Sequence, residues 1–185
     1  VFGASQAWLY KMFKERQPVL YEKIRKLVAE GRWEIHGSSW VEFDTNMPAG
    51  ESIVRQILFG KKFYREEFGI DARMLWQPDT FGYSAVLPQI MKKTGLDYFM
   101  TMKLSSNLIT QFPYHTFFWQ GIDGTKVLSH MLPEGNYVSG LRPQSVAKIE
   151  KEFKDKGRSD WALCMFGVGD GGGGRRRRTV GGGLA

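Results

Sequence analysis

The chain has 185 residues, of which 42% are hydrophobic and 14% aromatic, enough for one domain with a real core; this excludes an intrinsically disordered chain. Its formal net charge is +7, but four of its 26 Lys and Arg residues form the run 175–178. Without that run 22 basic residues face 19 acidic ones. The body is nearly neutral, so its charge does not indicate a nucleic-acid-binding protein.

Other bulk features point to a folded protein of the cytoplasm. No apolar run approaches the roughly 18 residues of a membrane span, and no signal-peptide pattern is present. The single cysteine, Cys164, lies in an apolar run, where we expect a small buried side chain in a reducing compartment. The chain begins with Val, and we expect it to be a piece of something longer.

The first half of the chain alternates strand and helix patterns. We expect Ser5 to cap the first helix and Gly31 and Gly69 to end the next two. In chain order the pattern predicts a strand at 1–4, a helix from residue 6, a helix at 18–30, a strand at 33–36, a helix at 51–68, a strand at 73–77, a helix at 85–94 and a strand at 97–102.

The second half begins with a hairpin signal. Apolar segments at 117–119 and 127–131 flank the turn sequence of residues 121–124. A charged amphipathic helix at 145–156 and a buried strand at 161–166 are predicted to follow.

Alternation of this kind predicts an α/β fold with a parallel sheet or barrel. Residues 1–170 would form this domain. Residues 171–185 hold glycines and arginines that cannot build a core, so we expect a disordered tail.

Asp79 is the first candidate for chemistry. It follows a short apolar run that ends at Trp76, and Phe81 and Gly82 come directly after it. A carboxylate at the carboxyl end of a buried strand is where α/β enzymes place reacting groups. The alternative is that Asp79 only organises a turn.

Asp170 is the second candidate, since it also follows a predicted buried strand and has glycine neighbours that would let a ligand approach. Two such acids would face the same end of a barrel, and glycoside hydrolysis needs two carboxylates. The alternative is that Asp170 is a solvated turn residue, which its spacing alone favours. The glycines after it lack the Gly-Lys-Ser/Thr ending of a phosphate loop, which excludes a nucleotide site of that kind.

A metal site is a further possibility. The three histidines are His36, His115 and His130, and none forms a helical i, i+4 pair. If residues 121–124 close a hairpin, His115 and His130 would share a face and could bind zinc with Asp79. The alternative is that both are ordinary polar positions on a hairpin.

The loop at 38–46 mixes aromatic, acidic and amide side chains. Sugars are bound by aromatic faces together with hydrogen-bonding groups, so Trp40 and Asp44 are candidate substrate-binding residues. Equally, Trp40 and Phe43 could anchor the loop in a small core.

Several long motifs resemble family 38 glycoside hydrolases, the zinc-dependent retaining α-mannosidases, and most of all their cytosolic and vacuolar branch. They are WQPDTFGYSAVLPQIMKKTGL, SSWVEFDTNMPAGESIVRQILFGKKF, FPYHTFFWQGIDGTKVLSHMLP and FGVGDGGGG, and together they cover nearly all of residues 1–174.

The resemblance implies a seven-stranded β/α barrel, incomplete in this chain. It implies that Asp79 is the nucleophile and also a zinc ligand, and that Asp170 is the acid/base residue. Residues implied to contact substrate are Phe81, Lys103 and Tyr137.

The chain also departs from the family pattern. An early His-x-Asp metal motif and a late zinc histidine are absent, and residues 175–185 bear no likeness to the family. We therefore expect an internal fragment of the catalytic domain that is inactive alone and binds zinc poorly, with the other zinc ligands outside this chain.

The resulting hypothesis is hydrolysis of terminal α-mannosides in a mannose-containing oligosaccharide, with neither nucleic acid nor a membrane as partner. A metal-dependent carbohydrate deacetylase and a non-catalytic sugar- or nucleic-acid-binding module remain the alternatives. The sequence leaves the oligomeric state open.

Overall fold

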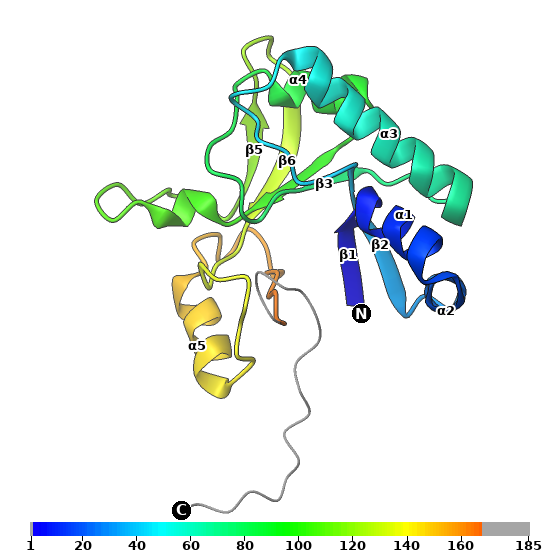
Figure 1. Ribbon diagram of the computed structural model, residues 1–185. Helices are drawn as coiled ribbons and strands as arrows, with labels where there is room; N and C mark the ends of the chain where they lie inside the picture. Colours follow the sequence, from blue (N-terminus) through cyan, green and yellow to red (C-terminus); the bar gives the residue numbers. More distant parts are fainter. Residues whose placement is uncertain (1, 168–185) are drawn as a thin grey trace, which may run out of the picture.

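The computed structural model describes residues 2–167, and it is an α/β fold (Figure 1). In chain order its elements are β1 (Phe2–Gln6), α1 (Ala7–Arg16), α2 (Pro18–Ala29), β2 (Trp33–Ser39), α3 (Gly50–Phe68), β3 (Met74–Trp76), α4 (Leu87–Lys93), β4 (Tyr98–Thr101), the 3₁₀ turn η1 (Lys103–Ser106), β5 (Thr116–Gln120), β6 (Lys126–Met131) and α5 (Pro143–Glu152). Most of the predicted strands and helices are therefore present.

The strands form two sheets. β1 pairs with β2 in parallel, and a second sheet has the order β3-β4-β6-β5. Within the second sheet β3, β4 and β6 run parallel, whereas β5 returns antiparallel along β6 as the predicted hairpin. The described residues thus give an α/β arrangement with one mixed sheet, and they do not by themselves display a seven-stranded barrel.

Helices pack on the sheets through apolar faces. Helices α1 and α2 lie beside β1 and β2, α3 packs on β2 and reaches the core of the second sheet, and α4 packs against β6 (Figure 1). Pro18 begins α2, and Gly69 ends α3 in the left-handed conformation at φ 69°, as the sequence predicts. The face of α3 that carries Ile53, Ile57 and Tyr64 is buried.

Three hydrophobic clusters hold the elements together. One lies between α3, α4 and the second sheet, and a second joins α1, α2, β2 and α3. The third is smaller and contains Met100, Met102 and Leu132, with Trp76 and Tyr137 packed against it. Trp76 and Tyr137 thus connect this core to the chain around Asp79.

The predicted strand at 161–166 is wrong. Only a single parallel bridge forms there, between Ser139 and Phe166. Trp161 is 85% exposed and Phe166 is 52% exposed, so the run is not a buried strand. An apolar sequence pattern does not show whether a partner strand is present. Within residues 2–167 no strand lies beside this segment to extend the single bridge into a ladder.

No helix of the described part is both long and apolar enough to cross a lipid bilayer.

Candidate active site

Asp79 lies in the loop that follows β3, as predicted. Two contacts fix this loop: the Tyr83 hydroxyl donates to the carbonyl oxygen of Thr80 at 2.8 Å, and the Thr45 hydroxyl donates to the carbonyl oxygen of Gly82 at 2.7 Å. Burial raises the pKa of Tyr83 to about 12, so its hydroxyl keeps its proton at neutral pH. The loop that carries Asp79 is therefore held rigidly at the end of the strand.

Lys103 and Tyr137 both reach the Asp79 carboxylate. The Lys103 ammonium forms an ion pair with Asp79 Oδ1, and the Tyr137 hydroxyl donates to Oδ2 at 3.3 Å. The Lys103 side chain is only 14% exposed, whereas that of Asp79 is 38% exposed. A carboxylate held at both oxygens, yet open on one side, is oriented toward whatever binds there.

Aromatic rings complete the cluster. The Lys103 ammonium lies 4.5 Å from the centre of the Phe81 ring and 5.5 Å from that of Tyr137. Phe81 is 77% exposed. An exposed ring beside a carboxylate leaves an apolar surface open to a ligand. Four residues chosen from the sequence, Asp79, Phe81, Lys103 and Tyr137, therefore meet in one place.

Glu42 is a second acid near this cluster, and it was not selected from the sequence. Its pKa is raised mainly by burial and further by the negative charge of Asp79, so the two carboxyl groups lie within electrostatic range. The Ser5 hydroxyl donates to Glu42 Oε1 at 3.0 Å. The prediction that Ser5 caps the first helix is wrong, because Ser5 belongs to β1 and its hydroxyl bonds Glu42. Helix α1 begins after Gln6 with no side-chain cap. The sequence feature that could have indicated Glu42 is its position as an acid in the loop directly after a strand.

Trp40 and Asp44 do not join the Asp79 cluster. Trp40 packs against Trp8 and Phe63, with ring centres 5.9 and 6.0 Å away. Asp44 is exposed, and its Oδ1 accepts the backbone N–H groups of residues 46 and 47 at 2.7 and 2.8 Å. Trp40 anchors the loop and Asp44 shapes it, while their role toward a substrate stays a prediction. Asp170 and the predicted tail lie outside the described residues.

The histidine pair does not form as predicted. Thr116 pairs with His130, and the connection spans residues 121–125 rather than 121–124. One extra residue moves His115 opposite Met131 and turns its side chain to the other face. The prediction that the two histidines share a face is wrong.

Each hairpin histidine accepts a hydrogen bond from a backbone N–H group. His115 Nδ1 accepts the Lys154 N–H at 3.0 Å, and His130 Nε2 accepts the Leu163 N–H at 3.2 Å. Burial lowers the pKa of His130 to about 4, which keeps its ring neutral and able to accept. His36, whose pKa burial also lowers to about 4, packs against the Trp76 ring at 4.4 Å. Within residues 2–167 no group of three or more His, Cys, Asp or Glu side chains could hold a metal ion.

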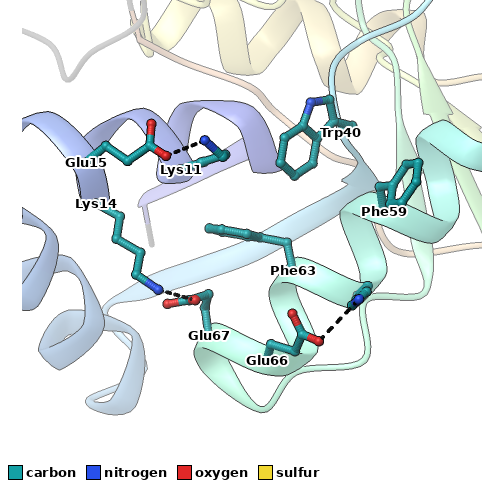
Figure 2. A pocket seen from close by; sticks show the side chains of 9 residues that line it. Lys11, Lys14, Glu15, Trp40, Phe59, Phe63, Glu66 and Glu67 are labelled. Carbon is teal, nitrogen blue, oxygen red and sulfur yellow. Dashed lines mark hydrogen bonds and ion pairs between the residues drawn. The ribbon is translucent and has the colours of Figure 1, made fainter.

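A surface groove of about 740 Å³ lies elsewhere, between α1 and α3 (Figure 2). Trp40, Phe59 and Phe63 form its apolar wall, while lysine–glutamate pairs such as Lys14 with Glu67 line its edge. The groove shares no lining residue with the Asp79 cluster and contains no catalytic pairing, so the cluster around Asp79 is the better candidate site.

Two solved structures resemble this chain in fold. An alpha-mannosidase from Enterococcus faecalis V583 matches with a TM-score of 0.68 and 22% identity, over 89% of this chain and 19% of that one. A 4-alpha-glucanotransferase from Thermococcus litoralis matches with a TM-score of 0.64 and 19% identity, over 87% and 25%. Identities this low establish the likeness of fold alone.

Sequence comparison identifies the family. The family model described as the glycosyl hydrolases family 38 N-terminal domain matches residues 1–180, and the chain belongs to this family. It is 46% identical to human Alpha-mannosidase 2C1 over 93% of its length, and 41% identical to an Alpha-mannosidase of Saccharomyces cerevisiae over 92%. It spans only 16% of the length of each of these relatives. The predicted family is confirmed.

Proposed function

We propose that this chain carries the nucleophile of a retaining hydrolase that acts on terminal α-mannosides. The observation that supports this most is the convergence of Asp79, Lys103, Tyr137 and Phe81 at the end of β3, in a chain of the family 38 glycosyl hydrolases. We infer that the sugar is mannose from the names of the relatives, which are alpha-mannosidases.

In this proposal Asp79 attacks the anomeric carbon of the mannoside. A bond forms between a carboxylate oxygen and that carbon as the bond to the leaving oxygen breaks, and the leaving oxygen takes a proton from an acid. Water then attacks the same carbon and gives a proton to the group that acted as the acid. The bond between the carbon and Asp79 breaks, which restores the free carboxylate. We assign the acid/base role to Asp170 from the family resemblance.

The neighbours of Asp79 have distinct roles in this scheme. The Lys103 ammonium pairs with Oδ1 and orients the carboxylate that attacks. The Tyr137 hydroxyl donates a hydrogen bond to Oδ2 of Asp79, while Lys103 pairs with Oδ1. Together these contacts restrict the rotation of the carboxylate. Phe81 covers one side of the site and offers its face to the apolar side of the sugar ring.

Zinc enters the proposal through the resemblance alone. Among the described residues Asp79 is the one ligand that the resemblance identifies, and those residues do not build a metal site by themselves. Its other ligands would lie outside residues 2–167. A closed β/α barrel and a cytoplasmic location are proposed on the same ground.

The stereochemistry of the first product tests the mechanism. We expect the complete protein to release α-mannose from an α-mannoside before mutarotation, because two displacements at one carbon restore its configuration. Proton NMR recorded during the first minutes of hydrolysis distinguishes the anomers. Initial release of β-mannose would show a single displacement and exclude a nucleophilic role for Asp79.

A further inference from the structure

Glu42 is held in place from both sides of its loop. Before it, the Trp40 N–H donates to the carbonyl oxygen of Gln56 at 2.8 Å, and the Val41 N–H donates to Gln56 Oε1 at 3.2 Å. After it, Phe43 is buried in the cluster beneath α3 and α4. Glu42 therefore has little freedom to swing away from the position it occupies.

The partner of Glu42 is equally constrained. Ser5 lies in β1, packed so closely on Gly37 of β2 that a Cβ at Gly37 would come within 2.3 Å of the Ser5 carbonyl oxygen. Gly37 also has φ 92°, which glycine adopts freely. This close approach fixes the Ser5 hydroxyl 3.0 Å from Glu42 Oε1. One oxygen of the carboxyl group is thereby oriented by the sheet itself.

The loop that carries Glu42 is also tied to the loop that carries Asp79. The Thr45 hydroxyl donates to the carbonyl oxygen of Gly82 at 2.7 Å and accepts the Ser84 N–H at 3.3 Å. These contacts keep the two acids at one end of the fold, which agrees with the effect of Asp79 on the pKa of Glu42.

Folding gives no reason for a carboxyl group at this position. Glu42 is half-buried, forms no ion pair within residues 2–167, and experiences the like charge of Asp79. Its Oε2 has no protein partner in the described part of the chain, while Oε1 has Ser5. Burying a carboxyl group without a cation costs free energy. A ligand that donates a hydrogen bond to Oε2 would offset that cost.

We propose that Glu42 is a substrate-contacting residue of this site, whose carboxyl group accepts a hydrogen bond from a hydroxyl group of the bound sugar. The proposal rests on the proposed mannosidase function and adds a specificity determinant to it. Sugar hydroxyls are donors that match the free oxygen, and a site built to bond a hydroxyl discriminates against analogues that lack it.

The test compares Glu42→Gln with the unaltered complete protein on an aryl α-mannoside and on its 2-, 3-, 4- and 6-deoxy analogues. We expect Glu42→Gln to lower kcat/KM for the parent mannoside by about tenfold or more, since a hydrogen bond to a charged group is replaced by a neutral one. For the analogue that lacks the contacted hydroxyl, variant and unaltered protein should act equally. The ratio of variant to unaltered protein cancels the intrinsic reactivity of each analogue.

Two further variants serve as checks. Ser5→Ala leaves the carboxyl group and removes its support, so it should show the same pattern over the analogues with a smaller loss. Glu51→Gln makes the same chemical change at an exposed position that pairs with Arg55, and it should leave every ratio near one. Circular dichroism spectra confirm that each variant folds.

Three outcomes would overturn the inference. An equal loss on all four deoxy analogues would show that no hydroxyl contacts Glu42. A loss that grows as the leaving group becomes poorer would identify Glu42 as a proton donor instead. A fall in bound zinc in Glu42→Gln would make it a metal ligand. If the unaltered protein hydrolyses no mannoside, the proposed function itself fails and this inference with it.

Discussion

Replacing Asp79 by asparagine should lower kcat for mannoside hydrolysis by roughly 10⁴-fold or more, because the amide cannot attack the anomeric carbon. The substitution is nearly isosteric, and the amide oxygen can still accept the Tyr137 hydroxyl. Lys103 would lose its carboxylate partner. Since the side chain of Asp79 is 38% exposed, we expect the fold to tolerate the change.

The matched control is Asp160→Asn, the same chemical change at an exposed position outside the cluster. It should retain full activity. Steady-state kinetics of both variants, with bound zinc measured on each, separate loss of the nucleophile from loss of metal. Should Asp79→Asn retain more than a tenth of the activity with its zinc intact, Asp79 is not the nucleophile.

Gly60→Ala should destabilise the fold by about 2–3 kcal/mol, even though alanine is the better helix former. Gly60 lies in the middle of α3, where that helix packs on the end of β2. A Cβ there would lie 2.4 Å from the carbonyl carbon of Ser39 and 2.5 Å from the carbonyl oxygen of Ser38. These are backbone atoms that cannot rotate aside, so α3 or β2 must move.

Gly50→Ala in the same helix is the control. A Cβ at Gly50 meets nothing within 4 Å, so helix propensity alone should decide and the variant should be as stable as the parent or slightly more stable. Denaturant unfolding of both variants gives the comparison. Equal stabilisation by the two alanines would show that α3 does not approach β2 this closely.

The close approach at Gly60 also affects the candidate site. Ser39 ends β2, and the loop with Glu42 begins directly after it. A shift of α3 would move Gln56, which binds the backbone of Trp40 and Val41. We therefore attribute the placement of Glu42 partly to a glycine 18 positions later in the chain.

The sequence predicted the features that depend on residues close to one another in the chain. Helix α3 ends at Gly69 because only a residue tolerant of positive φ closes the helix there. Asp79 was selected because an acid after a buried strand is a local pattern. Lys103 and Tyr137 came from the family resemblance, since nothing local shows that side chains 24 and 58 positions away reach one carboxylate.

Features that depend on register or on tertiary contact were not predictable in this way. A five-residue connection instead of a four-residue one inverted the face of His115, and sequence alone does not decide between the two. Glu42 stands among several polar residues of its loop, and only packing distinguishes it from the exposed Asp44. The run at 161–166 has the composition of a strand but lacks a partner for it within the described residues.

The central claim is that Asp79 bonds covalently to the sugar, and trapping that bond tests it most directly. The complete protein is incubated with a fluorinated mannosyl fluoride that forms the intermediate quickly and releases it slowly, and is then digested for mass spectrometry. We predict one added fluoromannosyl group, located on Asp79. A label on any other residue, or an active protein that acquires no label, would contradict the claim.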